Sequence, residues 1–187
     1  YEDLSVFKEM HVDGIRLDEG FDGMKESLMT YNPQGLKIEL NASTQLVYVE
    51  NIMDHHPDRE KLITCHNFYP QQYTGLSLAH FNKCNEKMKS MHLPVAAFIS
   101  SNSEGTYGPW PVNEGLCTLE MHRGLPMDFQ ARHLFATGMV DDVLVANAYA
   151  SDEELKACAA VNPSILTFGL VLEKELTEIE QKILDYG

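Results

Sequence analysis

The sequence predicts a parallel β/α protein, because one unit recurs along it: a short β-type run with a polar end, followed by a helical segment. The runs are at residues 14–21, 36–43, 61–70, 94–101 and 141–151. Strands that alternate with helices indicate parallel pairing, since a parallel neighbour is reached only through a crossover. We therefore expect an α/β fold in which these runs lie side by side.

Helix-boundary residues support this reading of the segments between the runs. Ser77 is an expected N-cap before the fourth run. Pro126 and Gly138 stand near the start and at the end of another helical segment, where proline and glycine are favoured. Ser151 and Glu154 have the spacing of a capping box after the fifth run.

The alternation within the first two runs favours a TIM (β/α)8 barrel over an open doubly wound sheet. In residues 14–18 the apolar Ile15 and Leu17 alternate with Arg16 and Asp18, so apolar residues are expected to face outer helices and charged ones the barrel axis. No GxGxxG motif follows a run, which removes the main sign of a dinucleotide-binding fold. A complete barrel needs about 250 residues. Either about three further units precede this chain or the fold is smaller.

The end of the chain departs from the repeated unit. Residues 162–172 predict one more strand, and the acidic residues 173–187 predict partial helix. We divide the chain into residues 1–165, part of a barrel, and 166–187, an exit segment.

Composition limits the class of partner. The chain has 14 basic and 28 acidic residues and a net charge of -14, which argues against nucleic acid or an anionic membrane as partner. The four cysteines form no CxxC pair, so no zinc site and no small disulfide framework is expected. Residues 1–20 lack the pattern of a signal peptide, and no apolar run reaches the roughly 18 residues of a membrane span. These features favour a cytoplasmic protein with reduced thiols; the oligomeric state is left open.

Charged residues near strand ends are the first candidates for a site. Barrel interiors are normally filled with apolar side chains, so ionic residues facing the axis point to an active site. The alternative is a structural ion pair of Arg16 or Lys37 with Glu39. Most other acidic residues, Glu26 among them, are expected on solvated helix faces.

Several motifs occur in the order found in one known family: RLDEGF, KIELNAST, CHNFYPQQYTGLS, GLCTLEMHR and DDVLVANAYAS. With these motifs the chain resembles the bacterial 6-phospho-N-acetylmuramidase family, long described as uncharacterised or outer surface proteins. The resemblance implies a TIM barrel followed by a smaller cyclophilin-like domain, with this chain supplying the fourth to eighth strands. It also implies hydrolysis of a disaccharide of 6-phospho-N-acetylmuramic acid and N-acetylglucosamine during recycling of the peptidoglycan cell wall, in the cytosol and without a cofactor.

Glycoside hydrolysis requires two carboxyl groups. Asp18 and Glu39 are the best pair by position, since both lie at the ends of neighbouring runs with inward parity. Glu19, Glu114 and Glu120 are reserve candidates. Adjacent strand ends favour a short separation of the carboxyl groups and a retaining outcome.

The remaining candidates are polar residues around the strand ends that are expected to bind substrate. Asn41, His66 and Asn67 offer donors and acceptors for sugar hydroxyls or the acetamido group, although a structural role for His66 is equally favoured. The long loop after the fourth run and the start of the next helix are expected to bind phosphate. Further candidates are rim, phosphate, anion and stacking residues: Tyr69, Tyr73, Ser100, Ser101, Gly105, Asn147, Arg123, Tyr107 and Trp110.

Two other functions stay open at this point. The same scaffold suits a metal-assisted sugar-phosphate isomerase or aldolase, but no short metal-binding spacing is present, and Lys37 is the only strand lysine near the axis. A non-enzymatic sugar-binding surface protein would need an export signal before residue 1.

Overall fold

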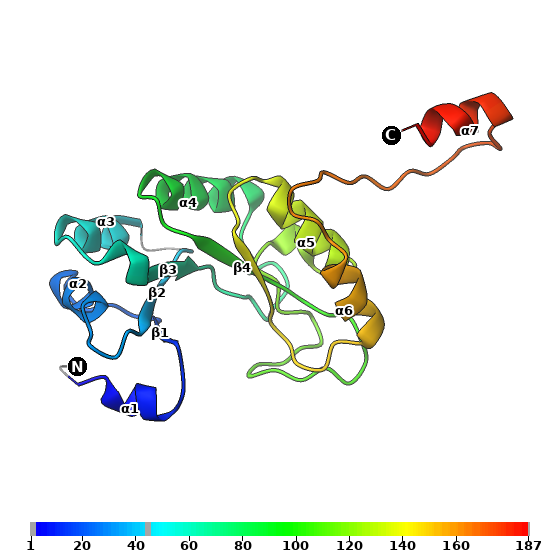
Figure 1. The fold of residues 1–187 in the computed structure, drawn as a ribbon. Helices are drawn as coiled ribbons and strands as arrows, with labels where there is room; N and C mark the ends of the chain where they lie inside the picture. The colour runs from blue at the N-terminus through cyan, green and yellow to red at the C-terminus, as the bar shows by residue number, and fades with distance from the viewer. Residues whose placement is uncertain (1–2, 44–45, 187) are drawn as a thin grey trace.

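A five-stranded parallel sheet forms the centre of the fold, in the order β1-β2-β3-β4-β5 (Figure 1). The computed structural model describes residues 3–43 and 46–186. The strands are β1 Gly14–Leu17, β2 Lys37–Asn41, β3 Leu62–Cys65, β4 Val95–Ile99 and β5 Asp142–Val145. Each lies inside one of the runs predicted from the sequence, and the parallel α/β fold is confirmed.

Helices connect the strands and follow the outer side of the sheet in an arc (Figure 1). The helices are α1 Ser5–Glu9, α2 Met24–Thr30, α3 Leu46–Asp54, α4 Leu78–Ser90, α5 Met127–Ala136, α6 Asp152–Ala159 and α7 Glu178–Leu184, with short 3₁₀ helices η1 Arg59–Lys61 and η2 Glu120–His122. Of these, α1 precedes β1, and α7 lies away from the sheet at the end of the chain (Figure 1). The predicted boundaries hold: Ser77 caps α4, Ser151 and Glu154 form the capping box of α6, and Gly138 follows α5 with φ +67°.

The apolar residues of the strands pack against these helices. Ile38 and Leu40 of β2 are fully buried in one core cluster with Val49 and Ile52 of α3. A second cluster joins β4 to α4 and α5. The alternation read from the sequence is therefore confirmed on the outer face, where burial of apolar area stabilises the sheet.

The inner face of the sheet carries polar side chains. Arg16 is in register with Glu39, and Asn41 is in register with Cys65. Residues in register on parallel neighbours point to the same side of the sheet. Among the described residues, the outer edges of β1 and β5 pair with no further strand, which is consistent with a half barrel.

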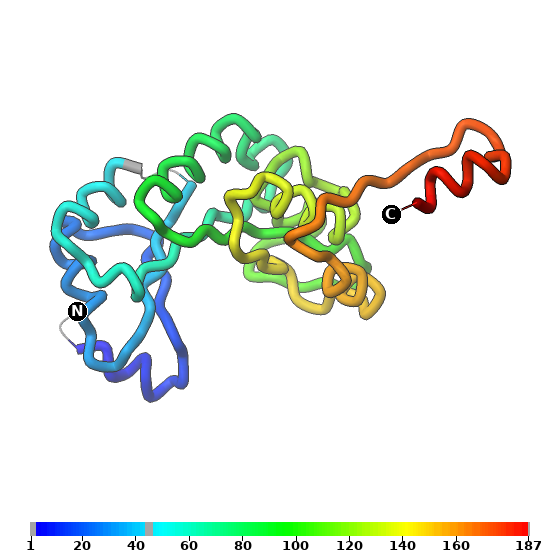
Figure 2. Tube along the Cα trace, turned by 45° about the horizontal axis from the view of Figure 1, so that its top comes forward, coloured from blue at the N-terminus to red at the C-terminus, as the bar shows by residue number. Residues whose placement is uncertain are grey.

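The strand predicted at residues 162–172 is wrong. This segment runs away from the sheet without regular structure (Figure 2), and Phe168 and Val171 are exposed. A β-type composition forms a strand only beside a partner strand, and the described part of the chain offers none here. The helix predicted within residues 173–187 is confirmed as α7.

Candidate active site

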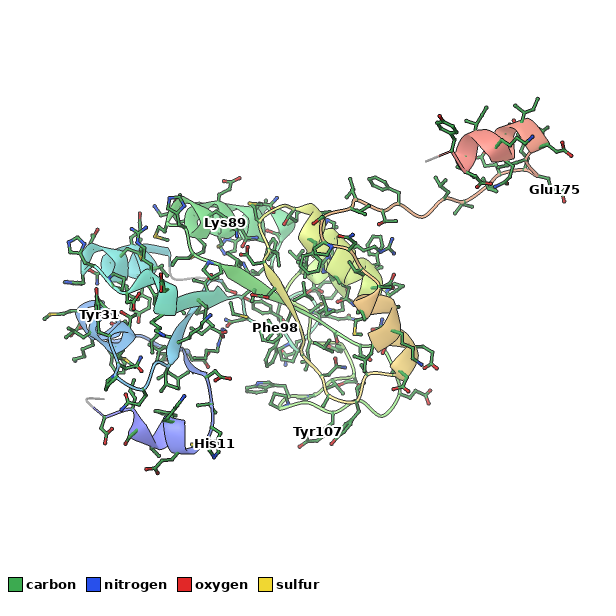
Figure 3. The ribbon with its side chains drawn as sticks, viewed as in Figure 1. His11, Tyr31, Lys89, Phe98, Tyr107 and Glu175 are labelled. Atoms are coloured by element: carbon green, nitrogen blue, oxygen red, sulfur yellow. The ribbon has the colours of Figure 1, made fainter. Side chains whose placement is uncertain are left out.

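A groove of about 610 Å³ opens at the carboxyl ends of the first four strands. We call it the strand-end groove. Its polar wall includes Asn41 and Asn67, and its apolar wall includes Phe68, Phe98 and Trp110. Phe98 lies near the middle of the molecule in Figure 3, whereas Tyr107 lies on the loop below it, outside the groove lining. A hollow with aromatic surface beside a few polar groups is the usual form of a sugar-binding site.

Arg16 ties three strand ends together in this groove. Its Nη1 donates to Glu39 Oε1 at 2.7 Å, its Nε to Asp18 Oδ1 at 3.2 Å and its Nη2 to Asn67 Oδ1 at 2.6 Å. Burial acts to lower the pKa of Arg16, but its hydrogen bond to Glu39 and the nearby negative charge outweigh burial and raise that pKa. The structure thus brings the two expected catalytic carboxylates to one guanidinium group. Lys37 is exposed and takes no part.

The Asp18 and Glu39 carboxylates differ in how exposed they are and in how firmly they are held. The side chain of Asp18 is 84% exposed, whereas that of Glu39 is 21% exposed. Glu39 sits within β2, and Asp18 follows the end of β1 on a loop. We infer that the position of Glu39 is fixed and that Asp18 has room to reorient.

A buried carboxylate holds the loop that carries Asp18. Glu26 is fully buried and accepts hydrogen bonds from the Gly23 and Phe21 amides and from the Tyr48 hydroxyl. Burial, followed by the bond to Glu26, raises the pKa of Tyr48. A Cβ at Gly20 would approach the Tyr48 ring to 1.9 Å. The expectation that Glu26 lies on a solvated helix face is wrong: it is an N3 residue that caps its own helix.

His66 lies outside the groove. Its side chain is fully buried, with Nδ1 3.2 Å from Ser43 Oγ and Nε2 2.7 Å from Asn85 Oδ1. Burial lowers its pKa to about 4. Cys65 is in register with Asn41 on the inner face, so the next residue turns toward the helices. The expected convergence therefore holds for Asp18 and Glu39 but not for His66, whose side chain is enclosed on the helix side of the sheet.

The serines expected to bind phosphate are internal. Ser100 and Ser101 are 3% exposed and Asn147 is 2% exposed. Asn147 accepts from the Ser101 amide at 2.9 Å and donates to the Ser101 carbonyl at 3.0 Å, and the Ser101 hydroxyl donates to Glu154. Their hydrogen bonds join the ends of β4 and β5, and Ser101 also lines a cavity beside the loop after β4. Their predicted contact with substrate stays a prediction.

A second cavity, of about 420 Å³, lies beside the loop after β4. Gly105 lines it with φ +81° and open space around its Cα. Glu104 and Glu114 also line this cavity, and Arg123 is the basic residue among the described residues that line it. Since acidic groups oppose an anion, this cavity is a poor phosphate site unless Arg123 is free.

Arg123 is not free. Its Nε and Nη2 donate to Glu120 at 2.8 and 2.7 Å, and its Nη1 donates to the Glu114 and Tyr69 carbonyls at 2.7 and 3.1 Å. Glu120 also accepts from the Tyr73 and Gly75 amides. Hydrogen bonding from Arg123 lowers the pKa of Glu120 to about 2. The pair organises the rim at residues 69–75, so neither the expected anion-binding role of Arg123 nor the reserve catalytic role of Glu120 is supported.

The rim residues themselves differ. Tyr69 packs against the second core cluster, and its amide donates to the Cys117 carbonyl. Tyr73 is 89% exposed and has φ +66°. Of these two tyrosines, Tyr73 is the one whose side chain is largely exposed.

Among the described residues, no group of three metal-binding side chains comes together. No described helix has the length and apolar character needed to cross a membrane.

Two buried histidines predict a pH-dependent stability. Burial lowers the pKa of both His66 and His122 to about 4, below the ordinary value near 6.5. The unfolded chain binds more protons between these values, so the free energy of unfolding falls as the pH drops from about 6.5 to 4, by about 3 kcal/mol per histidine. Urea unfolding across this range measures the slope, and His66→Gln should flatten it while replacement of the exposed His55 should not. If the His66→Gln variant kept the same slope, the assignment of this pH dependence to His66 would be contradicted.

The parallel sheet with a polar groove at its strand ends defines an α/β protein consistent with a TIM-like half barrel. A family model described as 6-phospho-N-acetylmuramidase, N-terminal, matches residues 1–160, and the chain belongs to this family. An uncharacterized B. cereus protein of known structure is 51% identical, with a TM-score of 0.92 over 97% of this chain and 52% of that chain.

A conserved Enterococcus faecalis protein of unknown function is 32% identical, with a TM-score of 0.71 over 82% of this chain and 42% of that chain. The chain thus spans about half of the first structure and less than half of the second. No curated protein matches it.

Proposed function

We propose that this chain supplies the active-site half of a glycosidase that cleaves a disaccharide of 6-phospho-N-acetylmuramic acid and N-acetylglucosamine in cell-wall recycling. The observation that supports it most is that Asp18 and Glu39 bind one guanidinium, that of Arg16, and that Arg16 and Asp18 line a groove with an aromatic wall. Membership of the family supports this class of substrate.

The two carboxylates suit different roles. Glycoside hydrolysis needs one carboxyl group to protonate the leaving oxygen and another to attack the anomeric carbon or activate water. Glu39, fixed by Arg16, suits attack at a defined point. Asp18, on an exposed loop, suits delivery of a proton to the leaving sugar. Phe68 and Trp110 offer ring surface for stacking on a sugar.

The same proposal includes the rest of the barrel. The open edges of β1 and β5 are expected to pair with further strands, so that residues 1–165 form the fourth to eighth units and residues 166–187 lead toward a cyclophilin-like domain. Exposed apolar residues along 165–172 are suited to packing against such a partner segment. We place the enzyme in the cytoplasm, where a disaccharide phosphorylated on uptake would be found.

Incubation with the phosphorylated disaccharide tests the function. We expect release of N-acetylglucosamine, with much slower release from the unphosphorylated disaccharide. The configuration of the newly formed sugar, followed by NMR, distinguishes retention from inversion, and the shared contact with Arg16 favours retention. Absence of cleavage in a folded protein with its full barrel would contradict the proposal.

A further inference from the structure

Two asparagine side chains lie on the same face of the sheet and line the strand-end groove. Asn41 ends β2 in register with Cys65, and Asn67 follows Cys65 by two residues. That spacing keeps Asn67 on the inner face as the chain leaves β3.

Obligate donors fix the orientation of both amides. Asn41 Oδ1 accepts from the Ser43 backbone N–H at 2.8 Å, and Asn67 Oδ1 accepts from Arg16 Nη2 at 2.6 Å. A backbone N–H and a guanidinium can only donate, so each partner must be the amide oxygen. Each Nδ2 therefore points away from these bonds, and neither donates a hydrogen bond to any residue that the structure describes.

The charge of the groove determines which kind of ligand group would accept hydrogen bonds from these two amides. Arg16 is shared by Glu39 and Asp18, and Glu19 adds a further carboxylate to the lining. A phosphate or carboxylate is disfavoured there, because the acidic groups outnumber the one cation. A neutral carbonyl oxygen is favoured, because it accepts from both amides without adding charge.

The neighbouring wall suits a small apolar substituent. Phe68 and Phe98 meet edge to face with ring centroids 5.3 Å apart, and both line the groove with the two asparagines. A carbonyl oxygen beside a methyl group is the chemistry of an N-acetyl substituent.

We propose that Asn41 and Asn67 form a donor pair that recognises the acetamido carbonyl of the amino sugar and so make the enzyme select N-acetylated substrates. The inference rests on the proposed function, since it assumes an amino-sugar ligand in this groove. It assigns specificity to the amide nitrogens and leaves bond cleavage to the carboxylates.

Asparagine-to-aspartate replacement isolates the nitrogens. Asn67→Asp keeps an oxygen for Arg16, and Asn41→Asp keeps one for the Ser43 amide, so each replacement removes the free donor and adds one negative charge. The probes are 6-phospho-N-acetylmuramic acid and its de-N-acetylated form, with affinities measured by calorimetry. The wild type should bind the acetylated form at least about tenfold more tightly, the scale of one unpaired donor.

In either variant this preference should vanish or reverse, since the amine of the second probe is attracted to the new carboxylate. Asn113→Asp, at the second cavity, adds the same charge elsewhere and should keep the wild-type preference. Thermal unfolding confirms that each variant is folded, and the two variants test the same donor pair independently.

Binding and cleavage separate the two proposals. A protein that prefers the acetylated probe but cleaves no disaccharide would refute the hydrolase and keep the donor pair. Equal affinity for both probes, no binding of either, or an unchanged preference in both folded variants would overturn the donor pair even in an active hydrolase.

Discussion

Glu39→Gln is expected to lower turnover of the phosphorylated disaccharide by about two or more orders of magnitude, the usual scale for a lost acid, base or nucleophile. Glutamine retains an oxygen for Arg16 Nη1, so the groove should keep its shape and the Michaelis constant should change little. Asp18→Asn should have a similar effect. Steady-state rates at saturating substrate measure both.

A matched control separates chemistry from charge. Glu86→Gln removes one carboxylate from the exposed face of α4 and should leave turnover unchanged. If a folded Glu39→Gln enzyme kept near-normal turnover, Glu39 would be structural. The role would then pass to Glu19, which lines the same groove.

Arg123→Met should have the largest effect on stability, lowering the free energy of unfolding by about 3 kcal/mol, since several charge-assisted hydrogen bonds are lost together. The side chain of Arg123 is only 9% exposed. Its loss would remove the donor to three backbone carbonyls and leave Glu120 with only its bonds from the Tyr73 and Gly75 amides. Denaturant unfolding measures the change. Arg132→Met, in a more exposed ion pair with Asp128, is the control and should cost less than about 1 kcal/mol. If both replacements lowered the free energy of unfolding equally, the proposed stabilising role of the Arg123–Glu120 pair would be contradicted.

The same pair has a pH signature. Because the folded pKa of Glu120 is lowered to about 2, its contribution is present above the ordinary pKa near 4.5 and is lost as the pH falls toward 2. Glu120→Gln should remove that part of the acid sensitivity. A variant as acid-sensitive as the wild type would show that Glu120 is not coupled to folding.

Strands and helix caps could be predicted from the sequence because they depend on local pattern. The alternation of apolar and charged residues around Arg16 and Glu39 placed both on the inner face, as the register confirms. The same alternation could have placed His66 correctly. Cys65 is in register with Asn41 on the inner face, so the side chain of the next residue, His66, points outward.

Other features depend on contacts that no local pattern contains. Glu26 is acidic and on a helix, yet the loop of residues 20–23 folds over it and buries it. Ser101 and Asn147 are distant in sequence, and only the pairing of β4 with β5 brings them together. The sequence does not show that Arg123 is engaged, because the carbonyls that accept from it belong to two distant segments, at Tyr69 and at residues 114–115.

The central claim, that the strand-end groove is the active site, is tested most directly by a crystal structure of the Glu39→Gln variant with the uncleaved phosphorylated disaccharide. We predict that the glycosidic oxygen lies over the ends of β1 and β2, within hydrogen-bonding reach of Asp18, with a sugar ring against Phe68 or Trp110. A disaccharide bound only in the second cavity, beside Gly105 and Glu114, would contradict the claim.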